Sequence, residues 1–206
     1  MKNIITLCLF LLFYSSNANS TSNGYWQLSS DDNGIAVYIH QHEGGLVEVK
    51  AVMNTKTSLH GFLALLQDTR NIPNWVDKVS YSRVIKQISP RENIVYTQFQ
   101  APWPAKSRDM VTYSIYTISD NVLTLQIKDA PNAIPVKNHL IRIQSVTAIW
   151  KLTTLSENST RIEYQAYADP GGSLPNWLVN KLAKESTRNT FTKLRQQLPK
   201  YQDTEH

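Results

Sequence analysis

The sequence contains a single cysteine, Cys8, among its 206 residues. Cys8 lies in an apolar N-terminal segment that we expect to be cleaved, so the mature chain would contain no cysteine. This excludes disulfide bonds and thiol chemistry from the folded protein, even in an oxidising compartment. A lipid anchor on Cys8 is not expected, because the apolar run that precedes it is too short.

The sequence also lacks any run of basic residues. Its 21 lysine and arginine residues outnumber the 16 aspartate and glutamate residues and give a formal net charge of +5, but they are scattered along the chain. A nucleic-acid surface would normally show a basic stripe, so nucleic acid is not an expected partner. Attraction to an anionic membrane surface stays open, since charge alone does not specify it.

Catalytic and metal-binding motifs are missing as well. The sequence contains no Gly-x-Ser-x-Gly elbow, His-Glu-x-x-His pair, Gly-x-Gly-x-x-Gly loop or Gly-x-x-x-x-Gly-Lys loop. We therefore expect no enzyme and no cofactor, although an active site made of a few polar groups in a cavity would leave no such motif. His40 and His42 lie two residues apart on a predicted strand. No third candidate ligand lies at a sequence spacing typical of metal sites, so no metal site is predicted.

The first twenty residues have the pattern of a secretory signal peptide. Lys2 supplies the positive start, the segment Ile4–Tyr14 is mostly apolar, and a small-x-small site ends at Ala18. Cleavage is expected after Ala18 or, as the second choice, after Ser20. The apolar stretch is too short to span a membrane. We expect a periplasmic or secreted protein, with a signal peptide over 1–20 and one domain over 24–201.

Most of the mature chain alternates between apolar and polar residues, as a strand with one buried face does. Leu123, Leu125 and Ile127, for example, alternate with polar residues. Short turn sequences such as Asp120-Asn121 separate these segments, which favours an antiparallel meander, because parallel pairs need long crossovers. The segment 26–32 is either a short helical turn or a lead-in to the sheet. Strands are expected at 35–40, 46–53, 79–88, 94–100, 109–118, 122–128, 140–144, 148–155 and 161–168.

Helices are expected within and after this run of strands. The first would be capped by Thr57 or Ser58 and run to about Gln67, with a short helical turn closing at Trp75. The second is a long C-terminal helix over 174–198 with one apolar stripe. A curved sheet of roughly eight or nine strands packed on this helix is an α+β architecture, and it leaves unfilled apolar space between the two. The stripe comprises Leu174, Trp177, Leu178, Leu182, Phe191, Leu194 and Leu198.

Several short motifs follow one another along the chain: Gly34-Ile35-Ala36-Val37-Tyr38, Trp75, Pro102-Trp103-Pro104, Arg108-Asp109-Met110-Val111 and Asp169-Pro170-Gly171-Gly172 with the following Pro175, Trp177, Leu178 and Asn180. Their order resembles that of START domains, the steroidogenic-acute-regulatory-protein-related lipid-transfer family. The chain resembles this family over nearly all of its mature length, and it is especially similar to the phosphatidylcholine-transfer-protein branch. The resemblance implies a helix-grip (START / Bet v 1-like) fold, in which a curved antiparallel sheet wraps a long C-terminal helix around a lipid-sized tunnel.

The resemblance also implies that the tunnel binds one hydrophobic ligand, such as a sterol, a phospholipid or a ceramide. Some members carry a buried acid and a buried arginine where this sequence has Gln98 and Ser114, so we expect a ligand with a modest polar head. The predicted ligand-binding residues are Trp75, Tyr96, Gln98, Trp103, Met110, Thr112, Ser114, Leu125, Trp150, Tyr164, Trp177, Leu178 and Leu182. The alternative is that the tryptophans are ordinary core and that Gln98 and Ser114 make structural hydrogen bonds.

The expected function is carriage of a lipid by a monomer that contacts membranes transiently. Gly171 and Gly172 are candidate hinges, and Lys181, Lys184 and Arg188 are candidates for contact with anionic head groups. The alternative interpretations are that the glycine pair only ends a strand and that the three basic residues form an ordinary solvated surface. Arg108-Asp109 is interpreted as a structural ion pair or turn contact. A cyclase or hydrolase of the same superfamily and a lipid-sensing module acting on a partner protein remain alternative functions.

Overall fold

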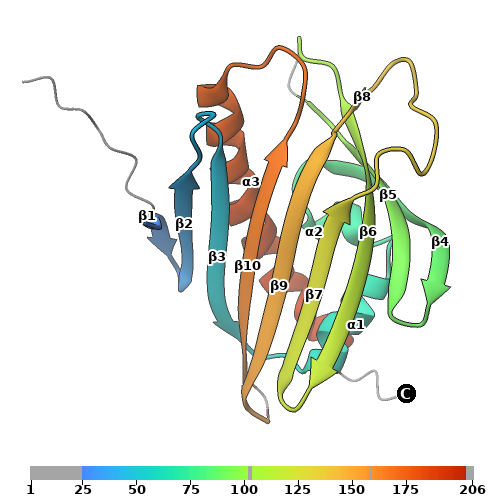
Figure 1. The fold of residues 1–206 in the computed structure, drawn as a ribbon. Helices are drawn as coiled ribbons and strands as arrows, with labels where there is room; N and C mark the ends of the chain where they lie inside the picture. Colours follow the sequence, from blue (N-terminus) through green and yellow to red (C-terminus); the bar gives the residue numbers. More distant parts are fainter. Residues whose placement is uncertain (1–24, 102–103, 158, 203–206) are drawn as a thin grey trace, which may run out of the picture.

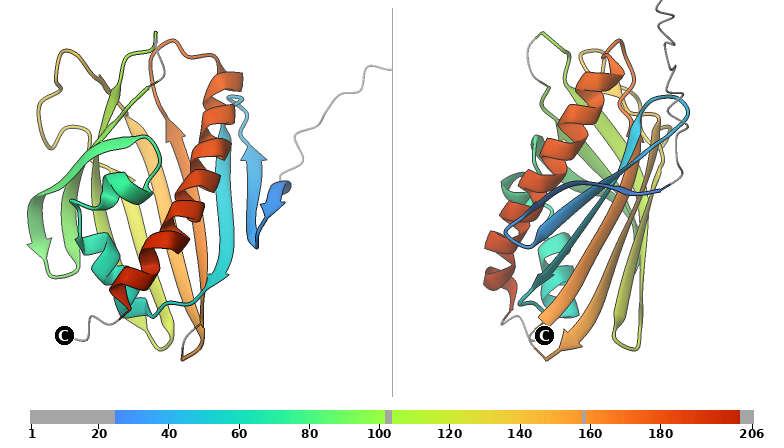
Figure 2. Two further views of the ribbon diagram at one scale, coloured as in Figure 1. Left: turned by 180° about the vertical axis from the view of Figure 1, so that it is seen from behind. Right: turned by 90° about the vertical axis from the view of Figure 1, so that its left-hand side faces the viewer.

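The computed structural model describes residues 25–101, 104–157 and 159–202. Within these residues, ten strands form one curved sheet, and a long C-terminal helix lies against its concave face (Figures 1 and 2). The predicted α+β architecture is therefore confirmed. The predicted signal peptide, including Cys8, and Trp103 lie outside the described residues. No helix of the described chain has the combination of length and apolar character needed to cross a membrane.

The sheet is an antiparallel meander whose two halves join through one non-sequential pair. Its order is β1-β2-β3-β10-β9-β7-β6-β5-β4, and the two-residue β8 pairs in parallel with β6 outside this path. β3 and β10 pair antiparallel, and this joins the N-terminal hairpin to the rest of the sheet. The strands are β1 Gln27–Asp32, β2 Ile35–Gln41, β3 Val47–Thr55, β4 Val79–Ser89, β5 Glu92–Phe99, β6 Arg108–Ser119, β7 Val122–Asp129, β8 Ile141–Arg142, β9 Ser145–Ser156 and β10 Ser159–Asp169.

Two segments differ from the prediction. The segment 26–32, for which a helical turn was one option, forms the edge strand β1, which pairs with β2. Its residues are mostly exposed and carry few apolar side chains, so no alternation marks it, and backbone pairing with β2 decides its conformation. The expected strand at 140–144 shrinks to Ile141–Arg142. The sheet thus has ten described strands rather than eight or nine.

Two short helices, α1 (Leu59–Gln67) and α2 (Ile72–Trp75), pack beside the C-terminal end of the long helix. Ser58 caps α1 as expected, because its Oγ accepts a hydrogen bond of 2.9 Å from the backbone N–H of Gly61. Gly61 also allows close packing: a Cβ there would lie 2.9 Å from the carbonyl oxygen of Tyr201, in the 3₁₀ turn Leu198–Tyr201 that follows the long helix.

The long helix α3 (Asn176–Gln197) is buried along only half of its length. Phe191 and Leu194 in its C-terminal half are 0% exposed. Trp177 near its N-terminus is 68% exposed, and Leu178 and Leu182 are half-buried. Trp177 is therefore wrongly assigned to the apolar stripe, while the leucines of the N-terminal half are covered only in part.

Candidate ligand cavity

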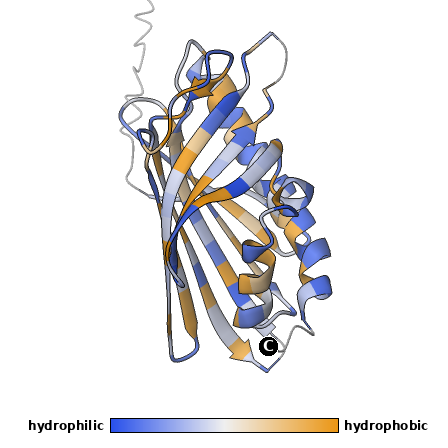
Figure 3. Cartoon of the chain, turned by 90° about the vertical axis from the view of Figure 1, so that its right-hand side faces the viewer, coloured by the Kyte–Doolittle hydropathy of each residue, from blue (hydrophilic) through white to orange (hydrophobic). Residues whose placement is uncertain are grey.

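A cavity of about 900 Å³ lies between the concave face of the sheet and the three helices. Figure 3 shows hydrophobic and hydrophilic residues interspersed along the long strands. The strands β7, β9 and β10 contribute mainly apolar residues to the lining of this space. Most of the lining is apolar. The main apolar lining residues are Leu63, Leu66, Ile72, Val79, Val84, Val95, Phe99, Met110, Leu125, Ile127, Ile143, Val146, Trp150, Tyr164 and Phe191.

Four tight aromatic contacts make the wall beneath α3. Trp150 lies at the centre of this wall, with ring centroids 4.3 Å from Tyr164, 5.7 Å from Phe191 and 6.3 Å from Trp75. Phe62 contacts the same tryptophan at 5.5 Å. Trp75 and Trp150 belong both to the core and to the cavity lining, so the two interpretations offered for the tryptophans are compatible at these positions.

Two polar groups in this wall have unusual environments. Tyr164 is half-buried in the cavity wall, and burial raises the pKa of its hydroxyl to about 12, so the hydroxyl stays protonated at neutral pH. The indole N–H of Trp75 is buried and makes no hydrogen bond to any described residue. An unpaired buried donor is costly, and it is satisfied when an acceptor arrives. A ligand oxygen is one such acceptor.

A row of small polar groups lies on β4, β5 and β6 within the lining. Ser114 Oγ donates a hydrogen bond of 2.5 Å to Asn93 Oδ1, and Ser82 Oγ lies 3.3 Å from Thr97 Oγ1. Thr112 lines the same side and is 4% exposed. Ser114 and Asn93 thus make the structural hydrogen bond that the sequence left open, while both still border the cavity. The row is neutral and offers hydroxyl and amide groups to a ligand.

Seven of the predicted ligand-binding residues lie in the cavity lining, as expected: Trp75, Met110, Thr112, Ser114, Leu125, Trp150 and Tyr164. That they contact a ligand stays a prediction. Tyr96 and Gln98 do not lie there: β5 turns Asn93, Val95, Thr97 and Phe99 inward, so these two side chains point to the outer face. The assignment of Tyr96 and Gln98 to the lining is therefore wrong by one residue of strand register.

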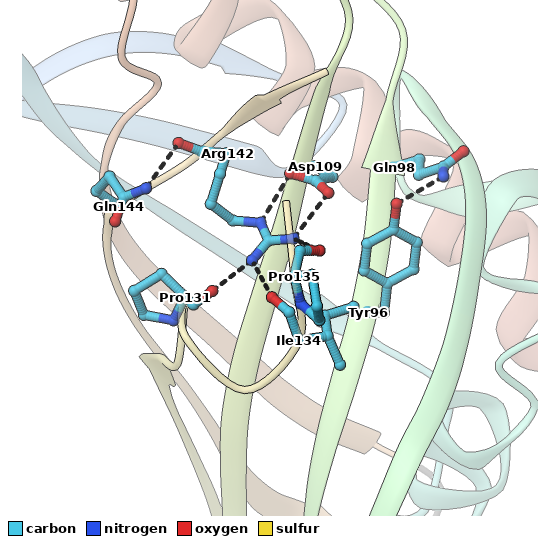
Figure 4. A network of polar contacts seen from close by, with 8 residues as sticks. All are labelled: Tyr96, Gln98, Asp109, Pro131, Ile134, Pro135, Arg142 and Gln144. Carbon is cyan, nitrogen blue, oxygen red and sulfur yellow. Dashed lines mark hydrogen bonds and ion pairs between the residues drawn. The ribbon is translucent and has the colours of Figure 1, made fainter. Parts of the chain in front are cut away.

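The outer face of β5 is covered, which explains that error. Tyr96 is 1% exposed although it points away from the cavity. Its hydroxyl accepts a hydrogen bond of 2.6 Å from Gln98 Nε2, and Lys137 Nζ lies 5.0 Å from its ring centroid. Figure 4 shows Ile134 and Pro135 beside this ring. Because both faces of β5 bear covered residues, alternation alone does not identify the inner one.

A buried ion pair holds the covering loop in place. Asp109 accepts hydrogen bonds of 2.8 and 3.0 Å from Arg142 Nε and Nη2, and both side chains are almost fully buried (Figure 4). Arg142 also donates to the carbonyls of Pro131, Ile134 and Pro135. Sequence reasoning missed this pair, because its members are 33 residues apart and neither motif nor periodicity links them. The pair lies outside the cavity lining.

A second hollow of about 290 Å³ lies under the N-terminal half of α3. It shares Asp77, Phe99, Ile143, Ala168 and Ser186 with the lining of the larger cavity, so the two adjoin. Leu182 lines this second hollow. Trp177 and Leu178 line neither space, so their predicted place in the tunnel wall is wrong; Trp177 instead faces solvent, with 68% of its surface exposed.

The connection between β10 and α3 closes the cavity at this end. Gly171 and Gly172 have φ of 63° and 74°, a conformation that favours glycine, and a Cβ on Gly172 would lie 3.1 Å from Ile141 Cδ1. Arg108 binds the connection by donating to the carbonyls of Pro170 and Gly171 at 3.3 and 3.4 Å. Partial burial lowers the pKa of Arg108. Arg108 thus makes a turn contact and Asp109 an ion pair, but not with each other.

Asp77 joins the middle of α3 to the segment before β4. Its carboxylate contacts Lys193 Nζ at 2.9 Å, and its backbone N–H donates to Thr190 Oγ1 at 3.0 Å. It is the only carboxylate among the described lining residues of the larger cavity, and no histidine or cysteine occurs among them. The described lining therefore offers shelter and hydrogen bonds rather than an acid–base pair.

Comparisons with known proteins agree with this geometry. The family model described as START domain matches residues 14–204. An uncharacterized protein of Pseudomonas aeruginosa, PA1579, is 27% identical over 95% of this chain and 97% of its own. The phosphatidylcholine transfer protein of Bos taurus is 24% identical over 82% of this chain and 81% of its own. A solved STAR-related lipid transfer protein from Xanthomonas axonopodis superimposes with a TM-score of 0.78 at 29% identity, covering 86% of this chain and 99% of that one.

Proposed function

The chain belongs to the START domain family, and on that premise we propose that it binds one hydrophobic lipid in its cavity and carries it across the periplasm. The observation that supports this proposal most strongly is the mainly apolar cavity of about 900 Å³ between sheet and helices. That volume is near the upper end of the roughly 300–1,000 Å³ of small-molecule sites. It suits a ligand with one or two acyl chains or a fused-ring body.

The reason for such a carrier is the cost of exposing a lipid to water. Each buried CH₂ group is worth about 0.8 kcal/mol, so a sixteen-carbon chain costs roughly 13 kcal/mol to expose. A lipid crosses an aqueous compartment only when that surface is covered. A closed apolar cavity supplies the cover without any chemical step.

The polar groups of the lining favour a ligand with an uncharged or weakly polar head. Ser82, Thr97 and Thr112 offer hydroxyls, and the buried ion pair of Asp109 lies elsewhere. The charged groups among the described lining residues are Asp77, which already contacts Lys193 Nζ at 2.9 Å, and Arg91, an exposed residue of the turn between β4 and β5.

The N-terminal half of α3 and the connection before it form the proposed gate. The residues 176–186 are all exposed or half-buried, and Gly171 and Gly172 precede them. Lys181, Lys184 and Arg188 give this half basic groups that favour anionic head groups at a membrane surface, although Lys181 also lies 4.0 Å from Glu185. The signal-peptide pattern at the N-terminus supports export, and with it the periplasmic location.

Native mass spectrometry of the protein purified from its own host tests the proposal. The expected result is one co-purifying lipid per chain. Protein that arrives empty and takes up no lipid from vesicles would contradict it. Vesicle-to-vesicle exchange then separates a carrier, which accelerates exchange, from a sensing module, which binds lipid without accelerating it. An enzyme would release a chemically altered ligand, and turnover would fail in a Ser114→Ala variant.

A further inference from the structure

Two histidines and a glutamate meet on the outer face of the sheet, opposite the cavity. His40 and His42 follow each other at an interval of two along β2 and its turn, so both project from the same face. Glu48 lies directly opposite His40 in the pairing of β2 with β3. The hairpin register therefore supplies the third group that the spacing of the histidines could not reveal.

The ligand atoms of these three residues converge on one point. The carboxylate atom Glu48 Oε2 lies 3.2 Å from His42 Nε2 and 3.8 Å from His40 Nδ1. Taken together, one ligand atom from each residue lies within 4.8 Å of the others. Four-coordinate zinc with bonds of about 2.0–2.2 Å holds its ligand atoms roughly 3.3 Å apart, so only small side-chain shifts separate this cluster from a metal site.

Neighbouring residues fix the cluster in this arrangement. Gln165 on β10 donates a hydrogen bond of 2.7 Å to the other carboxylate oxygen, Glu48 Oε1, and so leaves Oε2 facing the imidazoles. The rings of Trp26 and Tyr167 flank His40 and His42 with centroids at 5.8 and 4.7 Å. Outer-shell contacts of this kind orient the ligands of metal sites.

The charges and exposure of the cluster suit a cation that arrives from solvent. The glutamate side chain is 17% exposed, and the two histidine side chains are 28% and 39% exposed. Lys50 lies on the same face, and its Nζ lies 4.6 Å and 5.0 Å from the ring centroids of Trp26 and Tyr38. With neutral imidazoles, the cluster carries one negative charge and two nitrogen ligands.

We propose that His40, His42 and Glu48 bind one divalent transition-metal ion of the zinc class, with a fourth position open to water. Two imidazoles and one carboxylate match the ligand preference of Zn²⁺, Cu²⁺ and Ni²⁺ and are too few and too soft for Mg²⁺ or Ca²⁺. The site is separate from the lipid cavity and does not depend on the lipid-carrier function.

The bound ion would brace the hairpin that holds the N-terminal end of α3. His42 closes the turn to Leu46, and the turn carbonyls of Gly44 and Gly45 accept hydrogen bonds from Asn176 and Asn180 (Figure 2). An ion that binds the folded chain better than the unfolded one raises the melting temperature. Metal at this site therefore stabilises the fold from the outer face.

Calorimetric titration of Zn²⁺ into chelator-treated protein without a histidine tag tests the site. The expected stoichiometry is one ion per chain, with a rise in melting temperature. Gln165→Ala is expected to weaken binding by roughly 10–100-fold, as loss of an outer-shell partner does, and His42→Ala or Glu48→Gln by more. The matched control is a His60→Ala, His139→Ala variant, whose histidines lie away from the cluster and whose affinity should stay unchanged.

A spectroscopic measurement keeps the test decisive if one variant folds poorly. Imidazole ¹⁵N chemical shifts of the wild-type protein should move on Zn²⁺ addition at Nδ1 of His40 and Nε2 of His42. Three results would overturn the site: no binding by the wild-type protein, equal affinity in Glu48→Gln, or loss of binding in the His60, His139 control. The first of these would leave the pair of His42 and Glu48 as an ordinary hydrogen bond.

Discussion

The two halves of α3 are held by different kinds of contact. The C-terminal half inserts Phe191 and Leu194 into the core, where both are 0% exposed. The N-terminal half rests on the β2–β3 turn through Asn176 and Asn180, while Trp177 is 68% exposed. Apolar burial of large side chains is worth several kcal/mol, whereas a single hydrogen bond nets about 1 kcal/mol. One helix thus combines an anchor with an end that can open.

The largest expected effect comes from the anchored half. Phe191→Ala should destabilise the protein by about 3–5 kcal/mol, because it empties a fully buried site beside Trp150. Urea denaturation measures the loss. Thr192→Ala, one residue away and exposed, is the matched control and should change stability by less than about 0.5 kcal/mol. Equal losses for the two variants would remove the distinction between the buried and exposed sides of this half.

The second expected effect is a pH dependence of the free energy of unfolding, which arises at the same buried half of α3. Tyr164 packs on Phe191, and burial raises its pKa to about 12 from an ordinary value of 10. The raised pKa of Tyr164 stabilises the folded chain in full below pH 10. This stabilisation is lost as the pH rises from 10 towards 12, because the tyrosine hydroxyl loses its proton in the unfolded chain before it does so in the folded one. The loss is about 2–3 kcal/mol.

Denaturation curves of wild type and Tyr164→Phe across this range measure that contribution. The phenylalanine variant lacks the ionisable hydroxyl, so its stability should fall less steeply in alkali than that of the wild type. Identical slopes for the two proteins would show that the Tyr164 hydroxyl is not buried in the way described.

A smaller effect is expected in the loosely held half. Asn180→Ala removes a side chain that accepts from Val47 N–H at 3.0 Å and donates to the Gly45 carbonyl at 2.8 Å. The expected loss of stability is about 1–2 kcal/mol, with faster amide exchange confined to the first turns of α3. Hydrogen-exchange mass spectrometry distinguishes this local opening from a general loss. Faster exchange around Leu194 as well would mean that the halves do not move independently.

The smallest effect on stability is expected at the exposed end. Trp177→Ala should change the free energy of unfolding by less than about 0.5 kcal/mol, because most of the side chain already faces water. If this end meets membranes, the same variant binds vesicles more weakly, since tryptophan favours the membrane interface. Flotation of wild type and variant with vesicles measures that binding. A large loss of stability with unchanged vesicle binding would assign Trp177 to the anchored core instead.

The extent of α3 could be predicted from sequence because its signals are local. Pro175 stands at the N-terminal boundary, and the run without glycine or proline matches the observed Asn176–Gln197. The Ser58 cap of α1 was predictable for the same reason. Much of the sheet order also followed from short turns between alternating segments, except for the pairings of β3 with β10 and of β7 with β9.

The inner and outer faces of the strands were harder to assign, because they depend on what covers them. Tyr96 is buried on the outer face by a loop that Arg142 and Asp109 hold together, and a chain separation of 33 residues hides that pair from any local pattern. Trp177 fits the apolar stripe by spacing yet is exposed to solvent. Glu48 joins His40 only through hairpin register. Each case is a tertiary contact that periodicity does not encode.

The central claim is that the space between sheet and α3 holds the lipid, and filling that space tests it most directly. Ala148 lines the cavity from β9, whereas its neighbour Thr147 is exposed on the outer face. Native mass spectrometry should show that Ala148→Phe has lost the bound lipid while Thr147→Phe, with the same added bulk, retains one per chain. Retention of the lipid at full occupancy by a folded Ala148→Phe protein would contradict the account.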